Sequence, residues 1–495
     1  MKTATKTAVM KKALKTEKRV HPLSTKHTLA FFTILLLPAL SAFAAPERPN
    51  VLIICTDQQN AGMLSCAGNR WVKTPAMDSI ATNGARFTRA YCVNPVCVPS
   101  RTGMFTGYTP ARLGIEVNGD TAKVRIPSEI QEQGMGALFR NAGYETAYVG
   151  KVHVVGGVGK LGFTELKADS GDGETANASV AFLKQKRDKP FLLVASFVNP
   201  HDICYLEFGA STRAKDAAHQ KKGKTAADSE GEGSKQAKVN VALALKRPEG
   251  ISEADFFAKH CPPLPTNAEP QQDAPDAVGQ GGSSWSTEQW RQHCWTYCRL
   301  TEQVDREIGR VLQALRDAGL EEKTLIVFTS DHGEMDGSHQ ARRKGKFFEE
   351  AAGVPFIVSL KGVTKPGGVD SQHLVSSGQD LLPTLCDFAG IKPPAALLGR
   401  SVRALAEGRA APEWRPYVVS ETRGGRMLCS GRYKYCVYEK GTSREQLVDL
   451  EKDPGEMKNL AADPAHADIL ARHRQYLREW VTTNNDKLAE GYLVK

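Results

Sequence analysis

The sequence predicts an α/β fold: a doubly wound, mostly parallel sheet flanked by helices, followed by a small C-terminal α+β subdomain. Two observations lead to this prediction. Short, almost wholly apolar runs alternate with segments of helical periodicity, as in parallel sheets whose two faces are covered by helices. After about residue 410, short runs follow one another closely instead, which is typical of antiparallel strands. We therefore expect a main domain at residues 45–410 and a subdomain at residues 411–495.

Five runs are expected to form the main sheet, and each is rich in Val, Ile, Leu or Phe. They are residues 51–56, 146–150, 190–198, 324–330 and 355–360. Because these runs are apolar throughout rather than alternating, we expect both faces of the sheet to be covered.

Three intervening segments are expected to be helices. The first begins with Thr74 as its cap and Pro75 at the first helical position. The second begins with a capping box of Ser128 and Gln131 and ends at Gly143. The third places five apolar residues on one face and ends at a glycine: Leu300, Val304, Ile308, Val311, Leu315 and Gly319.

Residues 205–290 interrupt this alternation. Residues 213–238 are polar, charged and poor in aromatic residues, so we expect them to be mobile. The stretch that follows is rich in Pro, Gly and Gln and is expected to be irregular structure laid over the surface.

The C-terminal subdomain is expected to combine an antiparallel sheet with a helix. Its four short runs are residues 415–421, 426–431, 433–439 and 445–451. A long helix is expected to follow, from about Pro464 to Lys487.

Residues 1–44 have the pattern of an export signal peptide. A basic stretch precedes an apolar run, residues 29–44, which ends in a small-residue cleavage pattern at 42–44. A membrane anchor is the alternative, but the run is shorter than the roughly 20 residues that span a bilayer, and Pro38 interrupts it. No cysteine follows the run, which argues against a lipid anchor. We therefore expect a cleaved, periplasmic or secreted protein with no stable membrane anchor.

The net charge of +10 is concentrated in that segment, which holds eight Lys or Arg and one Glu. No later basic patch is interleaved with aromatic residues, so we exclude nucleic acid as a partner. The cysteine count is 11, an odd number, so at least one thiol stays unpaired within the chain.

Polar residues directly follow four of the apolar runs. In chain order they are Asp57 and Gln58, Lys151 and His153, His201 and Asp202, and Asp331 and His332. A single residue of this kind is more often a helix cap or a loop residue. Because ligands bind at the carboxyl ends of parallel strands, however, all four sets are expected at one edge of the sheet and favour a site there.

These residues predict a cation beside an anion pocket. Asp57, Gln58, Asp331 and His332 offer mostly oxygen ligands, which favours calcium or magnesium over zinc. The other candidates are cationic or able to carry protons: Arg101, Lys151, His153, His201 and Lys344. Such a set is typical of a pocket for a tetrahedral oxyanion ester, a sulfate or a phosphate. From spacing alone, Lys344 is better explained by a solvated basic loop.

Cys97 begins the run Cys-Val-Pro-Ser-Arg, residues 97–101. Pro99, near a helix start, places the preceding loop at a helix N-terminus, where an anion is favoured. A disulfide with Cys92 is one alternative, although it would not require the Pro-Ser-Arg sequence. A zinc site lacks partner cysteines at suitable spacing. A thiolate nucleophile is another alternative, but an exported thiol is exposed to oxidation.

These motifs resemble the type I sulfatases of the alkaline phosphatase superfamily. Residues 97–101 match that family's Cys-x-Pro-Ser-Arg modification signature, and the usual Thr-Gly follows at 106–107. Six further segments occur in the family's order: residues 74–91, 143–153, 329–339, 344–357, 380–391 and 447–461. The resemblance covers residues 48 to about 480 except 205–290. It implies an alkaline phosphatase-like fold whose catalytic domain is residues 45–410.

The resemblance also implies a modified nucleophile and a metal. A formylglycine-generating or sulfatase-maturating enzyme would oxidise Cys97 to formylglycine during synthesis. One calcium ion per chain, with magnesium less favoured, would be held by Asp57, Gln58, modified Cys97, Asp331 and His332.

The same resemblance implies a role for each remaining candidate. One hydroxyl of the hydrated formylglycine would attack sulfur, while His201 and Lys344 assist the departing alcohol. His153 would then deprotonate the other hydroxyl, which expels sulfate. Arg101 and Lys151 would steady the hydrate and the sulfate.

Two residues depart from a common family pattern, since Gln58 stands where many members have Asp and His332 where many have Asn. Both variants occur in the family, including in its phosphonate monoester hydrolase branch. We therefore expect an enzyme that removes sulfate from a sulfated carbohydrate, with a phosphonate monoester or phosphodiester hydrolase as the first alternative. An inactive homologue that only binds sulfated glycans is the second, and the full set of charged residues argues against it.

Overall fold

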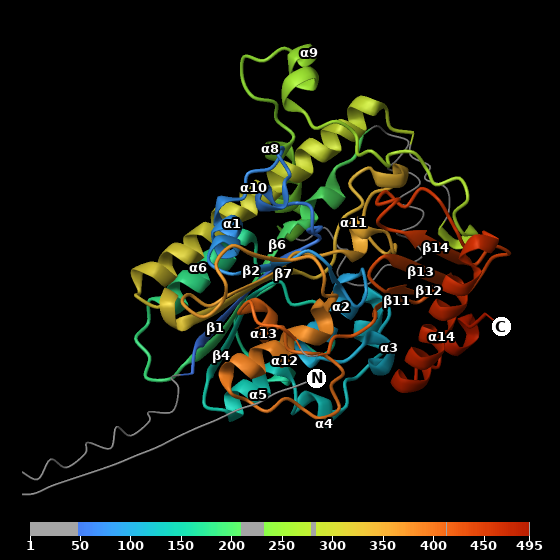
Figure 1. The fold of residues 1–495 in the computed structure, drawn as a ribbon. Coiled ribbons are helices and arrows are strands. Elements are labelled where there is room, and N and C mark those ends of the chain that lie inside the picture. Colours follow the sequence, from blue (N-terminus) through green and yellow to red (C-terminus); the bar gives the residue numbers. More distant parts are fainter. Residues whose placement is uncertain (1–47, 209–231, 279–283, 412, 495) are drawn as a thin grey trace, which may run out of the picture. The chain divides into compact units, whose positions relative to one another are not determined.

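A central sheet of eight strands organises the fold. The computed structural model describes residues 48–208, 232–278, 284–411 and 413–494, which belong to one compact unit, Arg48–Lys495. The strand order is β5-β4-β6-β1-β7-β8-β2-β9, and helices lie on both faces (Figure 1). The predicted signal peptide, residues 1–44, lies outside the described residues.

The four strands in the middle of the sheet confirm the prediction of a parallel core. They are β1 (Asn50–Asp57), β4 (Glu145–Gly150), β6 (Phe191–Pro200) and β7 (Thr324–Ser330). β1 lies between β6 and β7 and is parallel to both, and β6 is parallel to β4. All four carboxyl ends therefore lie at one edge of the sheet.

The fifth predicted strand differs in direction. β8 (Phe356–Ser359) is antiparallel to both of its neighbours, β7 and β2 (Ala85–Phe87). The chain between β7 and β8 contains only short helices, such as α11 (Glu349–Ala352), so it makes no crossover to the other end of the sheet. An apolar run that is buried on both faces carries no signal of its direction, which is why the sequence did not reveal this reversal.

The edges of the sheet were not predicted, because their strands are short or exposed. β5 (Thr164–Ala168) forms one edge, and β9 (Gly368–Asp370) forms the other. A separate pair joins β3 (Ala90–Tyr91) to β10 (Val375–Ser376).

Two helical layers cover the sheet. One face carries α1 (Pro75–Thr82), α6 (Asp172–Leu183) and α10 (Thr287–Asp317), which share a core with Ile54, Val149 and Phe328. The other carries α2 (Cys97–Thr106), α5 (Met135–Asn141), α12 (Ser377–Ala389) and α13 (Arg403–Ala406). Short helix α3 (Pro110–Leu113) follows α2. The predicted apolar face of α10 is confirmed, since the five residues listed for it from the sequence are all fully buried.

Two helix starts differ from the prediction. Thr74 is at the cap position, but its hydroxyl donates to Asp78 Oδ1 (3.0 Å) and makes no side-chain bond to the backbone of α1. The predicted second helix is divided into α4 (Ser128–Gln131) and α5, with Gly134 capping the latter. Its capping box is absent, because the Gln131 amide donates to the Ile126 carbonyl instead (2.6 Å).

The segment 205–290 is more regular than predicted. It contains α8 (Glu232–Ala244), whose Val241 and Ala244 are buried against Tyr297 and Leu300 of α10. A one-turn helix, α9 (Glu253–Asp255), follows. The prediction of wholly irregular structure was therefore wrong, because apolar residues spaced along this polar stretch find a partner on α10. Residues 209–231, most of the stretch predicted to be mobile, lie outside the described residues.

The predicted C-terminal sheet is confirmed as four antiparallel strands in sequence order. They are β11 (Val418–Thr422), β12 (Gly425–Cys429), β13 (Tyr433–Tyr438) and β14 (Glu445–Asp449). α14 (Ala467–Asn484) packs against one face through Leu477 and Trp480. The boundary at 410/411 stays a prediction.

None of the helices in the described part of the chain is both long and apolar enough to cross a membrane.

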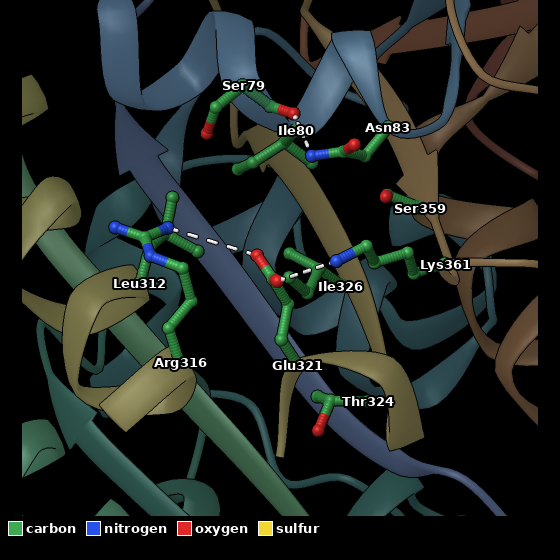
Figure 2. A pocket seen from close by; sticks show the side chains of 10 residues that line it. All are labelled: Ser79, Ile80, Asn83, Leu312, Arg316, Glu321, Thr324, Ile326, Ser359 and Lys361. Carbon is green, nitrogen blue, oxygen red and sulfur yellow. Dashed lines mark hydrogen bonds and ion pairs between the residues drawn. The ribbon is translucent and has the colours of Figure 1, made fainter. Parts of the chain in front are cut away.

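A pocket at the opposite edge of the main sheet holds none of the predicted site residues. It lies beside Thr324, the first residue of β7, and Ser359, the last residue of β8. Glu321 in this pocket pairs with Arg316 (3.9 Å) and Lys361 (3.2 Å) (Figure 2). Because ligands of parallel sheets bind at the carboxyl ends, this location does not favour catalysis.

Glu421 on β11 predicts a pH dependence of stability. Burial raises the pKa of its carboxyl to about 7, and among the described residues only one of its oxygens accepts a hydrogen bond, from the Ala111 N–H (2.7 Å). Because folding then favours the protonated acid, the free energy of unfolding should fall as pH rises from about 4.5 to 7. Glu421→Gln should reduce the change between pH 5 and pH 8 by about 2 kcal/mol, measured by urea denaturation. Equal pH dependence in the two proteins would contradict this assignment.

Candidate active site

The predicted residues meet at the carboxyl edge of the main sheet. Asp57 ends β1, Lys151 follows β4, His201 follows β6 and Asp331 follows β7. Cys97 is the first residue of α2 and reaches the same edge.

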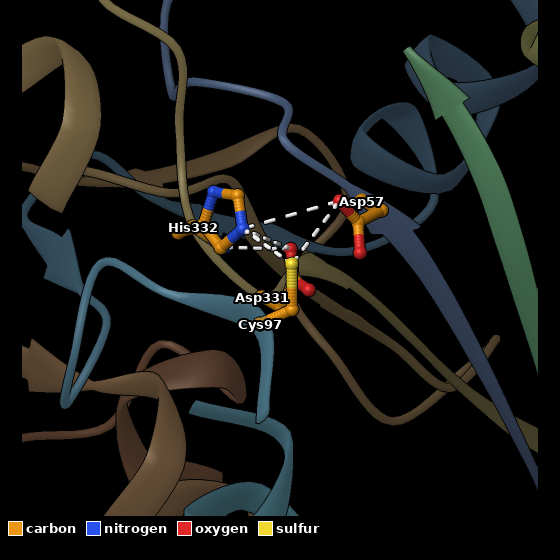
Figure 3. A group of neighbouring side chains, drawn as sticks. All are labelled: Asp57, Cys97, Asp331 and His332. Carbon is orange, nitrogen blue, oxygen red and sulfur yellow. Dashed lines mark hydrogen bonds and ion pairs between the residues drawn. The ribbon is translucent and has the colours of Figure 1, made fainter. Parts of the chain in front are cut away.

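Four buried side chains form the centre of the site. Asp57, Cys97, Asp331 and His332 each offer a ligand atom, and these atoms all lie within 4.8 Å of one another (Figure 3). The Nδ1 atom of His332 lies 2.9 Å from the carbonyl oxygen of Gly333, so Nε2 faces the cluster, 3.2 Å from Cys97 Sγ. Two carboxylates and one imidazole can hold a divalent cation here.

Arg101 connects the two carboxylates. Its Nε donates to Asp331 Oδ2 (2.7 Å), and its Nη2 donates to Asp57 Oδ2 (3.1 Å). Nη1 donates to Ser196 Oγ (2.7 Å) on β6. Lys151 Nζ lies 2.8 Å from Asp57 Oδ2, so the cations balance the buried acids.

Lys344 does not extend into solvent as its spacing suggested. The side chain is half-buried, and its Nζ lies 3.0 Å from Cys97 Sγ. The following Gly345 N–H donates to the carbonyl of Pro95 (2.9 Å), which fixes this loop beside α2. Although burial disfavours the ammonium, the charges of Cys97 and Asp57 raise the pKa of Lys344.

Burial and opposing charges set the ionisation of the centre. Burial and Asp57 oppose a thiolate, but Lys344, Lys151 and His332 hold the pKa of Cys97 well below its usual value. Burial alone would raise the pKa of Asp57, but nearby positive groups hold it well below its usual value. Lys151 is the strongest of these groups. Burial and the charge of Asp57 raise the pKa of Asp331. Because burial and the charge of Asp57 disfavour the ionised form of Asp331, a divalent cation bound here would offset the negative charge of the two carboxylates.

The two candidate proton carriers differ in their surroundings. Burial, Lys151 and Lys344 lower the pKa of His201 well below its usual value, so the ring is neutral at neutral pH. His153 has a left-handed backbone conformation (φ 38°), and its buried Nδ1 has no hydrogen-bond partner among the described residues. The structure thus brings Lys151, Lys344 and His201 around the four-residue centre, whereas His153 keeps a buried nitrogen without a hydrogen-bond partner among the described residues.

The disulfide alternative for Cys97 is excluded. Cys97, Cys92 and the other nine cysteines are all free thiols, and all lie within the described residues.

The predicted ligand Gln58 lies next to Asp331. The amide of Gln58 contacts Glu334 and Cys204, and its backbone N–H donates to Asp331 Oδ1 (3.1 Å).

Two residues of the site escaped sequence analysis. Ser196 lies inside an apolar strand and gave no signal, yet its hydroxyl contacts Arg101 and the Lys151 carbonyl (2.7 Å). Glu334 follows His332 by two residues, and a buried acid so close to predicted ligands could have been noticed.

Comparison with known proteins agrees with this geometry. A sequence profile described as Sulfatase matches residues 49–391. The chain belongs to the sulfatase family. A second profile, N-sulphoglucosamine sulphohydrolase, C-terminal, matches residues 337–483 of this sulfatase. The protein is therefore an enzyme, a sulfuric ester hydrolase with the mixed, mostly parallel sheet of its relatives.

Individual relatives cover nearly the whole sulfatase. The Delta 4,5-hexuronate-2-O-sulfatase of Bacteroides thetaiotaomicron is 30% identical over 469 residues, which are 90% of this chain and 91% of the relative. The solved structure of a 2-O GAG sulfatase is 28% identical, with a TM-score of 0.75 over 90% of this chain and 94% of that one. The phosphonate monoester hydrolase of Agrobacterium radiobacter shares the fold at 21% identity, with a TM-score of 0.67 over 88% and 96% of the two chains.

Asp331→Asn tests the cation site. Removing one charged ligand should weaken calcium binding by about 100-fold or more, and turnover should fall with it. Calorimetric titration with calcium after treatment with a chelator measures the first effect. Asp305→Asn is the matched control, because Asp305 is equally buried but accepts the N–H groups of Ala76 and Met77 on α1. Unchanged calcium affinity in Asp331→Asn would refute the assignment of this ligand.

Proposed function

We propose that this sulfatase removes sulfate from a sulfated carbohydrate, with a formylglycine derived from Cys97 as nucleophile and one calcium ion as cofactor. The observation that carries the proposal is the position of Cys97, which lies between the buried acids and Lys344. The relative that is named for a hexuronate 2-O-sulfate and the 2-O GAG sulfatase support a carbohydrate substrate.

The residues around Cys97 suit both proposed groups. Calcium would be held by Asp57, Gln58, residue 97, Asp331 and His332. When present, the hydrated formylglycine supplies a hydroxyl nucleophile, and calcium supplies positive charge beside the sulfate. Arg101 keeps the two carboxylates in place, and Lys151 adds a positive charge that orients the sulfate.

Lys344 and His201 are proposed to act at the leaving group. The raised pKa of Lys344 keeps its ammonium charged, so it can stabilise negative charge on the departing oxygen. Burial and then the charges of Lys151 and Lys344 lower the pKa of His201, and a sulfate anion that enters this site would favour the protonated ring. His201 could then give a proton to the alcohol.

His153 is proposed as the base that releases sulfate. Its position, two residues after Lys151, brings an imidazole to the same sheet edge, and its buried Nδ1 needs a partner. Histidine suits this step because its ordinary pKa lies near neutrality.

Export and maturation belong to the same proposal. Residues 1–44 would direct the chain to the periplasm or outside the cell, without a stable membrane anchor. A formylglycine-generating or sulfatase-maturating enzyme would modify Cys97 during synthesis.

A phosphonate monoester or phosphodiester hydrolase is the second candidate. It is favoured by Gln58 and His332, which occupy positions where many sulfatases carry Asp and Asn, and by the fold shared with the phosphonate monoester hydrolase. A sulfate ester and a phosphonate monoester or phosphodiester carry similar negative charge, so substrate assays have to separate the two functions.

Enzyme from a host with a working maturation system should carry an aldehyde at position 97 and release sulfate from glycans. Peptide mass spectrometry measures the first, with Cys92, five residues earlier in the sequence, as the unmodified control. Sulfate release is measured on a panel of sulfated saccharides, led by a 2-O-sulfated unsaturated hexuronate. A paired aryl sulfate and aryl phosphonate are assayed in parallel to compare the two ester classes. An active preparation that holds only thiol at 97, or that prefers the phosphonate, would overturn the proposal.

His153→Ala and His201→Ala should affect different steps. Without His153, about one alcohol per active site should still appear in a burst, while sulfate release becomes slow. Without His201, the leaving group lacks its proton donor, so the first step slows and no burst appears. We expect each steady-state rate to fall by about 100-fold or more. Rapid-quench measurement of alcohol and sulfate separately decides the roles, and a burst in His201→Ala alone would show that they are exchanged.

A further inference from the structure

Glu334 is a fully buried carboxylate beside the proposed cation site, and the proposed chemistry gives it no role. Its Oε1 accepts the backbone N–H of Arg343 and, at 3.4 Å, that of Asp336. Its Oε2 accepts a hydrogen bond from the side-chain amide of Gln58. The two backbone donors fix one oxygen of Glu334 and thereby direct the other oxygen to Gln58.

This contact determines how the Gln58 amide is turned. A glutamine amide has a donor nitrogen at one end and an acceptor oxygen at the other, and in the contact with Glu334 the carboxyl oxygen is the acceptor. The nitrogen of Gln58 therefore faces Glu334, and its oxygen takes the other side of the amide. The thiol of Cys204 lies beside both ends, 3.1 Å from the nitrogen and 3.4 Å from the oxygen, and it can donate only to the oxygen.

The backbone of Gln58 is held beside the centre as well. Its N–H donates to Asp331 Oδ1 (3.1 Å), and its carbonyl accepts the hydroxyl of Tyr297 (2.6 Å). The residue adopts a left-handed conformation (φ 67°), which few non-glycine residues do without such anchoring. These contacts fix the backbone of Gln58 but do not fix the direction of its side-chain amide. Another residue has to set that direction.

We propose that Glu334 is a positioning residue that turns the amide oxygen of Gln58 toward the cation. An amide with the opposite orientation would present N–H groups to calcium, which binds oxygen. The inference rests on the proposed function, because the cation itself is part of that proposal. Residues that orient a metal ligand commonly contribute 10- to 100-fold to metal affinity, by the general experience with such sites.

Glu334→Gln reverses the contact while keeping its shape. The new amide oxygen would take the place of Oε1 and keep the backbone N–H donors, so its NH₂ group would face Gln58. Gln58 would then have to present its own oxygen to that group and its nitrogen to the cation. Calorimetric titration of the full-length protein with calcium should show a dissociation constant at least about 10-fold larger than for the wild type.

A double-mutant cycle separates orientation from simple charge. If Glu334 acts through Gln58, adding Glu334→Gln to Gln58→Ala should change calcium affinity by less than about 2-fold. If the negative charge of Glu334 alone attracts calcium, its full effect should persist in the Gln58→Ala background, and that result would overturn the inference. Glu350→Gln is the matched control, since Glu350 is a half-buried acid that accepts from Asn267 (2.8 Å) and has no hydrogen bond or ion pair with the four central residues in the described part of the chain.

A second double variant keeps the inference testable if Glu334→Gln folds poorly. Gln58→Glu with Glu334→Gln exchanges donor and acceptor, so the pair keeps its hydrogen bond and again offers oxygen to the cation. It should bind calcium at least as tightly as the wild type, and weaker binding would contradict the proposal. Wild-type protein that binds no calcium would refute the proposed cofactor, whereas wild-type binding that Glu334→Gln leaves unchanged would refute only the role of Glu334.

Discussion

The buried ion triad of Arg101 with Asp57 and Asp331 is the interaction on which the site depends. Arg101 joins the ends of β1 and β7, and all three side chains are fully buried. Breaking a buried pair of this kind by removing one partner costs about 3–5 kcal/mol, because a charge is left without compensation. Arg101 is four residues from Cys97 on α2, about one helical turn. Holding its guanidinium between the carboxylates therefore also places Cys97 at the four-residue centre, where the cation is proposed to bind.

The C-terminal sheet supports the other side of the site. Lys434 on β13 is buried and donates to the Phe347 carbonyl (2.8 Å) and to Glu349 (3.0 Å), just after the loop that carries Lys344. Segments far apart in the sequence are thus tied together by buried charge. The helix α8 contributes similarly, because its Asn240 donates to Asp202 (2.8 Å), the neighbour of His201. The segment without a counterpart in the family motifs consequently contacts the neighbour of the residue proposed to protonate the leaving group.

Much of the fold and most of the site residues could be predicted because their signals are local. Apolar runs located the four parallel strands, the 3.6-residue period located α10, and the position of polar residues after strands located Asp57, Lys151, His201 and Asp331. The cysteine motif singled out Cys97 and Arg101 through resemblance to a family. These features depend on residues that are neighbours in the sequence, or on the general rule that parallel strands share a carboxyl edge.

The sequence by itself thus determined the class of fold, the edge at which the site lies and the ligand types gathered there. Only the tertiary structure decided the reversal of β8, the division of the predicted helix at Gly134, and the packing of α8 on α10. It also decided that Lys344 contacts Cys97 and that Glu334 contacts Gln58, 276 residues away. The physical reason is that these outcomes depend on which surfaces meet after folding. Burial and hydrogen bonding between distant segments leave no periodic trace along the chain.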